Sequence, residues 1–239
     1  MGYIINSSKF KKAIQMLSLF TDMIVLEPIE NDDILISRFR NQGGTAFIKT
    51  MIPFEWEDDG NTPFRIVADT PHILDFIKLT DKSDTIEIEY LNGWYHFKSG
   101  KILSKIREVD FHYVSDSYMK RDIKLKFPCR FTLDVSSLKK LIGVAKNTTS
   151  ITFSTANGIL YGIYESSNKN NSVRLELGET TNNCKECVVV HLSKEYLGLY
   201  LKPFKGVIEV GFERKSDMPV LFKPSESIEL VIAHQVVET

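Results

Sequence analysis

Long apolar runs are absent from this 239-residue chain. No stretch approaches the roughly 20 apolar residues that a helix needs to cross a bilayer. The first five residues predict the start of a strand rather than a secretory leader. We therefore expect an intracellular protein without a membrane segment.

Cysteine is scarce, with three residues in the whole chain. Such a count is typical of a reduced compartment and not of a disulfide framework. Cys184 and Cys187 form a single C-x-x-C, and Cys129 is distant in sequence. A structural zinc site needs four ligands, usually from two such pairs. We expect a plain reduced Cys184–Cys187 pair and no metal.

Catalytic signatures are also missing. The chain has no phosphate-binding glycine loop, no H-E-x-x-H pair and no G-x-S-x-G elbow, and its five histidines are scattered. We therefore predict no catalytic residue and no cofactor, and we favour a binding or structural role over an enzyme. A nuclease or another enzyme stays an alternative that no set of residues supports.

A strong excess of positive charge is lacking too. Thirty Lys and Arg stand against 31 Asp and Glu, so the net charge is −1. Proteins that coat nucleic acid are usually strongly basic, so any DNA contact must come from a local patch. One stretch, 111–128, is locally basic because it holds four basic and two acidic residues: Lys120, Arg121, Lys124, Lys126, Asp116 and Asp122.

What the chain does contain is an internal repeat. A Lys-Lys pair at Lys11 and Lys12 returns 128 positions later at Lys139 and Lys140. Each pair follows serines suited to cap a helix and lies beside an apolar stripe with helical spacing. These stripes are Phe10, Ala13, Ile14, Leu17 and Leu138, Leu141, Ile142, Ala145.

The segments after each copy also correspond. Residues 33–39 match 158–164, 71–77 match 193–200, 86–89 match 208–211, and 95–98 match 220–223, with offsets of 122 to 128. A repeat of this length indicates duplicated domains. We predict domains at 1–110 and 129–239, joined by a connector at 111–128.

Hydrophobic periodicity and turn residues predict mostly strands, hence an α+β fold with two helices against antiparallel sheets in each domain. In the first half we expect helices at 8–20 and 70–79 and strands at 3–6, 23–29, 34–40, 45–52, 64–68, 85–91, 94–99 and 101–109, with an acidic loop at 54–63. In the second half we expect helices at 136–146 and 193–201 and strands at 129–134, 149–155, 158–165, 171–178, 186–192, 206–213, 218–222 and 227–236.

The whole chain resembles the sliding clamps of the proliferating cell nuclear antigen type. The resemblance rests on the helix with Phe10-Lys11-Lys12 and its echo, the element order of both halves, the connector, and the C-terminal runs 217–222 and 230–236. It implies the DNA-clamp fold in a divergent archaeal, viral or plasmid member, located in the cytoplasm of an archaeon or a host cell, or in the nucleus if the source is eukaryotic. It also implies a homotrimeric ring, with helices inside and sheets outside, that encircles duplex DNA and raises polymerase processivity.

Three sets of site residues follow from the resemblance. Lysines on or after the helices would face the DNA phosphates without reading bases: Lys9, Lys11, Lys12, Lys78, Lys82, Lys139, Lys140, Lys146, Lys194 and Lys202. Edge strands would join neighbouring subunits through Ile102, Ile106, Val109, Val173, Leu175 and Leu177. Short peptides of DNA polymerase, clamp loader, nuclease or ligase would dock on Phe39, Phe47, Tyr118, Met119, Ile123, Pro219, Val231 and Ala233.

Alternatives stay open for each set. The lysines could be ordinary solvated side chains, and Tyr118, Met119 and Ile123 could merely pin the connector to the body. The chain departs from the family in its basic connector, in His234 where a proline is usual, and in its near-neutral charge. It could instead be a subunit of a heteromeric or checkpoint-type clamp, or a non-ring factor held on DNA by charge.

Overall fold

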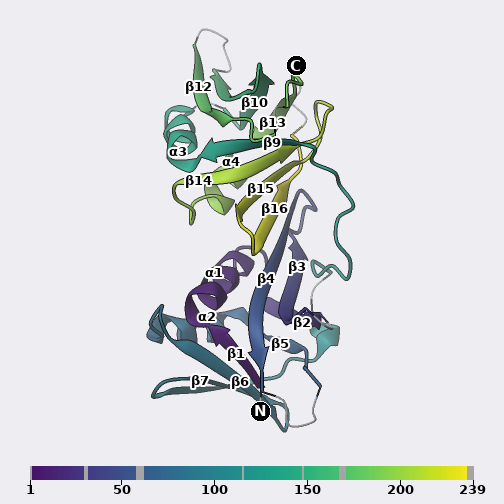
Figure 1. The fold of residues 1–239 in the computed structure, drawn as a ribbon, viewed down its shortest axis with the longest axis vertical. Coiled ribbons are helices and arrows are strands. Elements are labelled where there is room, and N and C mark those ends of the chain that lie inside the picture. Colours follow the sequence, from purple (N-terminus) through teal and green to yellow (C-terminus); the bar gives the residue numbers. More distant parts are fainter. Residues whose placement is uncertain are drawn as a thin grey trace. The chain divides into compact units, whose positions relative to one another are not determined.

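The computed structural model describes residues 2–29, 32–57, 62–114, 116–146, 148–166, 171–182 and 184–235 (Figure 1). The chain divides into two compact units. Unit 1 contains the chain up to Gly44 and Ile48–Asp122, and unit 2 contains Thr45–Phe47 and the chain from Ile123 onward. None of the helices in the described ranges has the length and apolarity to cross a membrane.

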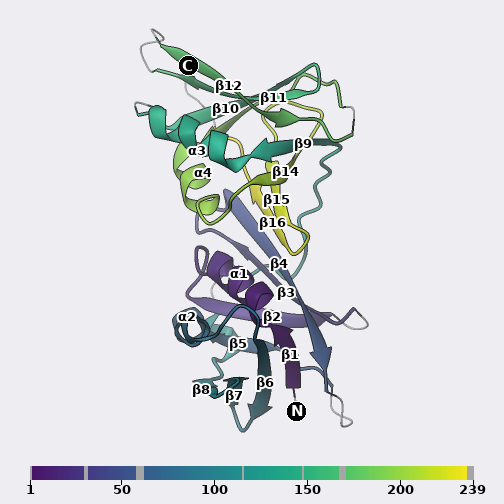
Figure 2. The same cartoon turned by 60° about the vertical axis from the view of Figure 1, so that its left-hand side comes forward.

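Unit 1 is built on eight antiparallel strands. Their hydrogen-bonded order is β8-β7-β6-β1-β4, and β4 continues through β3 and β2 to β5. Two helices, α1 (Ser7–Leu17) and α2 (Thr70–Leu79), pack side by side in this unit (Figures 1 and 2). The strands are β1 (Gly2–Asn6), β2 (Met23–Ile29), β3 (Ile34–Arg40), β4 (Ala46–Trp56), β5 (Ile66–Asp69), β6 (Thr85–Leu91), β7 (Trp94–Ser99) and β8 (Ile102–Arg107).

Unit 2 repeats this plan. Each of its strands corresponds to the strand of unit 1 whose number is lower by eight, so β9 corresponds to β1, and each helix to the one whose number is lower by two, so α3 corresponds to α1. Its sheets run β16-β15-β14-β9 and β12-β11-β10-β13, with α3 (Val135–Val144) and α4 (Lys194–Tyr200) packed together. The duplicated order expected from the sequence is confirmed. The strands are β9 (Cys129–Asp134), β10 (Ser150–Ala156), β11 (Ile159–Glu165), β12 (Ser172–Glu179), β13 (Val189–Ser193), β14 (Val207–Phe212), β15 (Val220–Ser225) and β16 (Ile228–Ile232).

The predicted strands 85–91 and 94–99 are confirmed as β6 and β7, which Asn92 and Gly93 join as a hairpin because both residues adopt positive φ (53° and 81°). The predicted start of α2 is also correct, with Asp69 at the N-cap position and a proline in the first turn.

Several boundaries were predicted wrongly. Strand β4 continues to Trp56 into the expected acidic loop, because β1 offers it a pairing partner as far as Tyr3. The strand expected at 227–236 is shorter, with β16 ending at Ile232, and residue 236 lies outside the described ranges.

The helix caps differ from the prediction as well. The side chain of Asn6, not a serine, caps α1 by accepting from the Lys9 N–H. Asp134 caps α3 by accepting from the N–H groups of Ser136 and Ser137. Ser7 is instead fully buried, and its hydroxyl lies 3.0 Å from that of Thr80. Helix α1 also ends at Leu17 rather than at residue 20.

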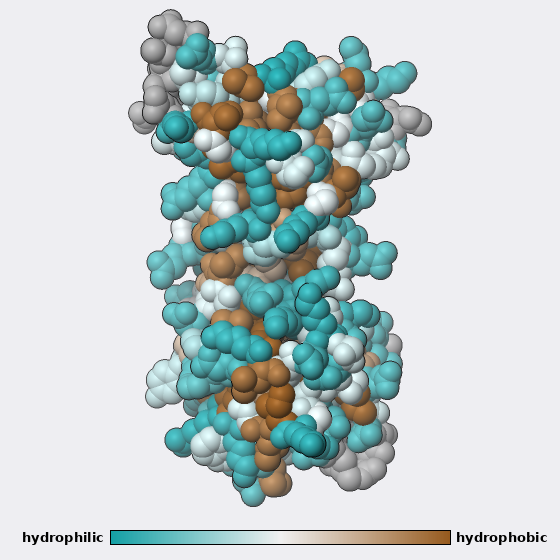
Figure 3. Space-filling model, turned by 90° about the vertical axis from the view of Figure 1, so that its left-hand side faces the viewer, coloured by the Kyte–Doolittle hydropathy of each residue, from teal (hydrophilic) through white to brown (hydrophobic). Residues whose placement is uncertain are grey.

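Aromatic side chains fill much of the core of unit 1. Tyr3 is fully buried, and its ring centroid lies 4.7–4.9 Å from those of Phe54, Trp56 and Phe64. Burial raises the pKa of Tyr3, whose hydroxyl donates to the Phe64 carbonyl. Unit 2 uses a smaller phenylalanine cluster of Phe131, Phe153, Phe212 and Phe222. On the face seen in Figure 3, apolar side chains gather in small groups among hydrophilic ones.

Candidate functional sites: basic helices, edge strands and connector

The basic face of α1 lies opposite its apolar stripe. Phe10, Ala13, Ile14 and Leu17 are at most 1% exposed. Lys9 and Lys12 are exposed, whereas Lys11 is half-buried. The Lys11 ammonium donates to the carbonyl of Ile77 in the last turn of α2, at 3.3 Å. This lysine therefore also serves the packing of the two helices.

The corresponding lysine of unit 2 does the same. The Lys139 ammonium donates to the Lys202 and Phe204 carbonyls just after α4, at 2.9 and 2.7 Å. A cation is favourable at the end of a helix, where unpaired carbonyls concentrate negative charge. The recurrence of Lys11 and Lys139 thus has a structural reason that the sequence pattern did not reveal.

Two other predicted lysines also have partners inside the chain. Lys194 donates to the Ala145 carbonyl at the end of α3, at 2.5 Å, and Lys78 pairs with Asp75 at 2.7 Å. The other six are exposed and form no ion pair within the described ranges. They are Lys9, Lys12 and Lys82 in unit 1, and Lys140, Lys146 and Lys202 in unit 2. Each unit therefore presents three such cations, on its first helix or in a turn that follows a helix.

Strand β8 is the outer strand of its sheet and pairs with β7. Of its predicted interface residues, Ile102 and the following Val109 are half-buried, but Ile106 is only 4% exposed and packs in unit 1. Leu103, which the prediction omitted, is 61% exposed. Ile106→Lys would therefore damage the core of the unit rather than test an interface.

Strand β12 is the outer strand of the four-stranded sheet in unit 2 and pairs with β11. Val173 is 40% exposed and Leu175 half-buried, whereas Leu177 is 2% exposed and lies close to Gly162 of β11. The exposed half of the strand is the part free to pair outside the chain.

The first part of the connector is fastened to unit 1. Its Tyr118 forms an antiparallel bridge with Phe39, flanked by hydrogen bonds from Arg40 N–H to the Ser117 carbonyl (2.8 Å) and from Met119 N–H to the Arg38 carbonyl (3.0 Å). The Tyr118 ring lies against Phe39, with centroids 5.5 Å apart. Burial and the nearby Glu27 carboxylate raise the pKa of Tyr118.

Asp122 anchors the same part of the connector. Its carboxylate pairs with Arg38 and, at 3.0 Å, with Lys49. Burial works against the charged form, but the hydrogen bonds from Lys49 and Arg38 prevail and lower the pKa of Asp122. Lys120, Arg121, Lys124 and Lys126 stay exposed, so the outward charge of the connector is positive.

The predicted peptide-docking residues fall in both units. Phe39, Tyr118 and Met119 lie together in unit 1, where Phe39 is fully buried beneath the connector. Phe47, Ile123, Pro219, Val231 and Ala233 belong to unit 2, where Phe47 and Val231 are buried and the other three are half-buried. The half-buried members are the ones a peptide could touch without rearrangement.

The cysteines do not follow the prediction. Cys184 is joined by a disulfide to Cys129, 55 residues away in sequence, and Cys187 is free and exposed. The expected reduced Cys184–Cys187 pair is therefore wrong. The sulfurs of Cys129 and Cys184 and the Glu186 carboxylate form a compact group that could hold a metal ion. Sequence reasoning missed this group because the fold, not the spacing, brings its members together.

Comparison with known proteins supports one fold. No protein-family profile and no curated protein sequence matches the chain. Solved structures do. The chain is similar to A. fulgidus PCNA, solved with the C-terminal region of FEN-1, at TM-score 0.81 and 17% identity over 99% of both chains.

Two further structures show the same likeness. The Sulfolobus tokodaii PCNA2–PCNA3 complex matches at TM-score 0.74 and 19% identity over 98% of this chain and 99% of the other. Entamoeba histolytica PCNA matches at TM-score 0.78 and 12% identity over 99% of this chain and all of the other. The chain has the DNA-clamp fold of the proliferating cell nuclear antigens.

Proposed function

We propose that this chain is a DNA sliding clamp. Copies of it close into a ring around duplex DNA, tether polymerases to it, and dock replication and repair enzymes without catalysing a reaction. The likeness to archaeal and eukaryotic clamps over almost the whole chain supports this function. Such a protein acts inside the cell, where the DNA is.

The observation that carries the proposal is a difference between matching sheet edges. In unit 2 the end of β16 is covered, because the Ala233 N–H donates to the Thr45 carbonyl at 2.8 Å and residues 45–47 group with this unit. Its counterpart β8 in unit 1 has no such cover in the part of the chain that the structure describes. Within the described ranges, β12, the counterpart of β4, is open as well except at its C-terminal end, where β9 meets it.

The two open edges suit each other. A second copy can lay its β12 along β8, as Thr45–Phe47 lies along the end of β16. This contact uses different surfaces on the two copies, and a head-to-tail contact of this kind builds a closed ring when its rotation closes. Pairing would also remove exposed strand edges that otherwise invite aggregation. Three copies would supply six similar units.

We assign DNA contact to the six exposed lysines, Lys9, Lys12, Lys82, Lys140, Lys146 and Lys202. A ring that slides cannot depend on base edges, and ammonium groups near phosphates bind without regard to sequence.

We assign peptide docking to the partly exposed residues of the predicted set. In unit 1 these are Tyr118 and Met119 on the connector, and in unit 2 they are Ile123, Pro219 and Ala233. The four exposed cations of the connector favour docking peptides with acidic flanks, by charge complementarity. Partners of this kind would be a DNA polymerase, a clamp loader, a nuclease or a ligase.

The first experiment is light scattering over a range of protein and salt concentrations. We expect the mass of three chains, independent of concentration. Leu103→Arg and Val173→Arg, each at an exposed position of an open edge, should give folded monomers. Leu91→Arg, at a position 58% exposed on β6, is the matched control and should keep the trimer.

A wild-type chain that stays monomeric at all concentrations would contradict self-closure. The likeness to the PCNA2–PCNA3 complex then favours a subunit of a heteromeric clamp. Salt distinguishes the third possibility, since a closed ring on circular DNA resists ionic strength that strips a factor held by charge alone.

A further inference from the structure

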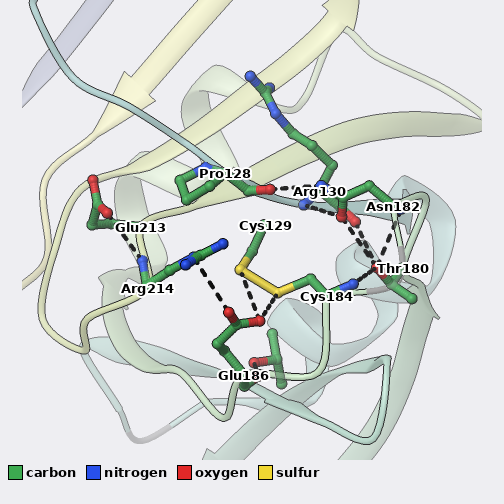
Figure 4. A network of polar contacts seen from close by, with 10 residues as sticks. Pro128, Cys129, Arg130, Thr180, Asn182, Cys184, Glu186, Glu213 and Arg214 are labelled. Carbon is green, nitrogen blue, oxygen red and sulfur yellow. Dashed lines mark hydrogen bonds and ion pairs between the residues drawn. A yellow bond between two sulfur atoms is a disulfide. The ribbon is translucent and has the colours of Figure 1, made fainter.

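The cysteine group of unit 2 forms a small polar network (Figure 4). Cys129 opens β9 and Cys184 lies in the loop before β13, and their exposed fractions are 2% and 7%. The Glu186 carboxylate faces both sulfurs. Its Oε2 lies 2.9 Å from the Cys184 sulfur and 3.7 Å from the Cys129 sulfur.

Hydrogen bonds hold the two cysteines together independently of the disulfide. The Asn182 side chain donates to the Pro128 carbonyl (2.6 Å) and accepts from the Arg130 N–H (3.2 Å), so it grips both neighbours of Cys129. The Cys184 N–H donates to the Thr180 hydroxyl at 3.0 Å, and that hydroxyl donates to the Arg130 carbonyl at 3.1 Å. Reduction would therefore leave two thiols side by side.

A hydrogen bond and an ion pair also hold Glu186 in place. Its carbonyl accepts from the buried Thr155 hydroxyl of β10 at 2.7 Å, which fixes the backbone. Its Oε1 pairs with the Arg214 guanidinium at 3.3 Å. Because Oε1 is occupied, Oε2 is the oxygen directed at the sulfurs. Partners that orient a ligand in this way are a regular feature of metal sites.

The disulfide alone does not explain this arrangement. A disulfide has no proton to donate, so the Glu186 Oε2 gains no hydrogen bond from the sulfurs beside it. Two thiolates and a carboxylate, in contrast, are the ligand types that Zn²⁺ prefers. They carry one negative charge more than a divalent ion neutralises, and the Arg214 guanidinium supplies the remaining positive charge.

We propose that the reduced chain binds a thiophilic divalent cation, Zn²⁺, through the Cys129 and Cys184 sulfurs and Glu186 Oε2, with water as the fourth ligand. The disulfide is the oxidised, metal-free state of the same site. Cys187 is exposed and takes no part.

The exchange between the two states is balanced. When Zn²⁺ binds, the two thiols release two protons to solvent. When a small-molecule disulfide oxidises the loaded site, its S–S bond breaks and takes up two electrons to give two thiolates. The Cys129 and Cys184 thiolates supply these two electrons and join to each other as the disulfide, and Zn²⁺ leaves.

The test uses Co²⁺ and Zn²⁺ on the full-length chain after reduction. We expect one equivalent of Co²⁺ per chain, with the strong near-ultraviolet absorption of cobalt–thiolate bonds, and displacement of that absorption by Zn²⁺. Cys129→Ser and Cys184→Ser should abolish binding. Cys187→Ser, the matched control, should bind like the wild type. Arg214→Gln should keep the thiolate absorption and lower the affinity about 10-fold, as loss of an orienting partner does.

Folding is monitored by circular dichroism, so that a misfolded variant is not counted. Oxidised glutathione should release the bound Zn²⁺ in step with the loss of free thiols, and a reductant should restore binding. The proposal fails if the reduced wild type binds no more metal than the Cys129→Ser and Cys184→Ser variants. It also fails if Cys187→Ser abolishes binding, since that result would place the metal at the C-x-x-C pair.

Discussion

The two units share one plan but hold their first strand in different ways. In unit 1, β1 pairs with β4 over three successive residues, from Tyr3 with Trp56 to Ile5 with Phe54. At the same place in unit 2, β9 meets the end of β12 at a single bridge, between Phe131 and Thr180. Side-chain hydrogen bonds supplement this bridge. The Thr132 hydroxyl donates to the Glu179 carbonyl and accepts from the Glu179 N–H.

This difference in strand pairing bears on the candidate metal site of unit 2. A regular ladder leaves no backbone group for other uses. In unit 2, where a single bridge takes the place of this ladder, the loop after β12 places Asn182, Cys184 and Glu186 against β9. The candidate metal site lies at this point of difference between the two units.

The largest expected effect comes from closing the space in which β12 meets β9. A Cβ on Gly178 would lie 2.2 Å from the Thr132 carbonyl oxygen, so one of the two strands must move. We expect Gly178→Ala to lower the free energy of unfolding of unit 2 by about 3 kcal/mol. Gly143→Ala in α3, where the added Cβ meets nothing within 4 Å, is the control and should be neutral or stabilising.

Urea unfolding can assign this loss to one unit. Both tryptophans of the chain, Trp56 and Trp94, lie in unit 1, so their fluorescence follows that unit, whereas circular dichroism follows both. Gly178→Ala should shift the circular dichroism transition more than the fluorescence transition. Equal shifts would mean that the units unfold as one and would remove the basis for treating their stabilities separately.

A second, smaller contrast lies in the helix caps. The Asp134 carboxylate caps α3, and its hydrogen bonds with Ser137 and Ser136 lower its pKa. Asn6 caps α1 and does not titrate. Replacing either cap by alanine should cost about 1 kcal/mol at neutral pH.

Only the cap of unit 2 should depend on pH. Because the folded pKa of Asp134 lies below the unfolded value, about 3.9, its contribution is complete above that value. It is lost as the pH falls through the folded pKa. Asp134→Asn keeps a capping side chain and should remove this part of the acid sensitivity. An Asp134→Asn chain with an unchanged pH profile of unfolding between pH 7 and pH 3 would contradict the assignment.

The smallest expected effects distinguish the first lysine of each repeated pair, Lys11 or Lys139, from the second, Lys12 or Lys140. Lys139→Met should destabilise the chain by about 0.5 kcal/mol, because the ammonium leaves two carbonyls at the end of α4, and Lys11→Met should cost less. Lys12→Met and Lys140→Met should leave stability unchanged. They should instead reduce the salt dependence of DNA binding, measured as the slope of affinity against salt concentration. If Lys12→Met and Lys140→Met instead lowered stability, and Lys11→Met and Lys139→Met changed only DNA binding, the roles assigned to the two lysines would be reversed.

Much of this fold could be predicted from the sequence. The repeat and its apolar periodicities gave the element order of both units, because an amphipathic pattern must bury one face wherever it lies. Ends were harder. The strand expected at 45–52 continues to Trp56 as β4, because it pairs with β1 there. The serines were plausible caps, but Asn6 and Asp134 each stand one position ahead of their helix and take that role.

The sites were less accessible because they depend on distant residues. Lys11 meets Ile77 across 66 residues, and Cys129 meets Cys184 across 55. No local pattern marks such a pair. Interface positions fail for another reason. Successive side chains of a strand point to opposite faces of its sheet, and an edge strand still packs one face on the core, so Ile106 and Leu177 are buried although their strands form open edges.

The charges along these edges have a consequence for direction. Lys105 and Arg107 are exposed on β8, whereas β12 exposes two acidic residues and one basic residue, Glu176, Glu179 and Arg174. Two β8 edges brought together would repel each other, whereas the net acidic β12 would attract β8. In the proposed ring, every copy would therefore be added in the same orientation. Such a ring would have a front and a back, so an enzyme bound to one of them would always face the same way along the double helix.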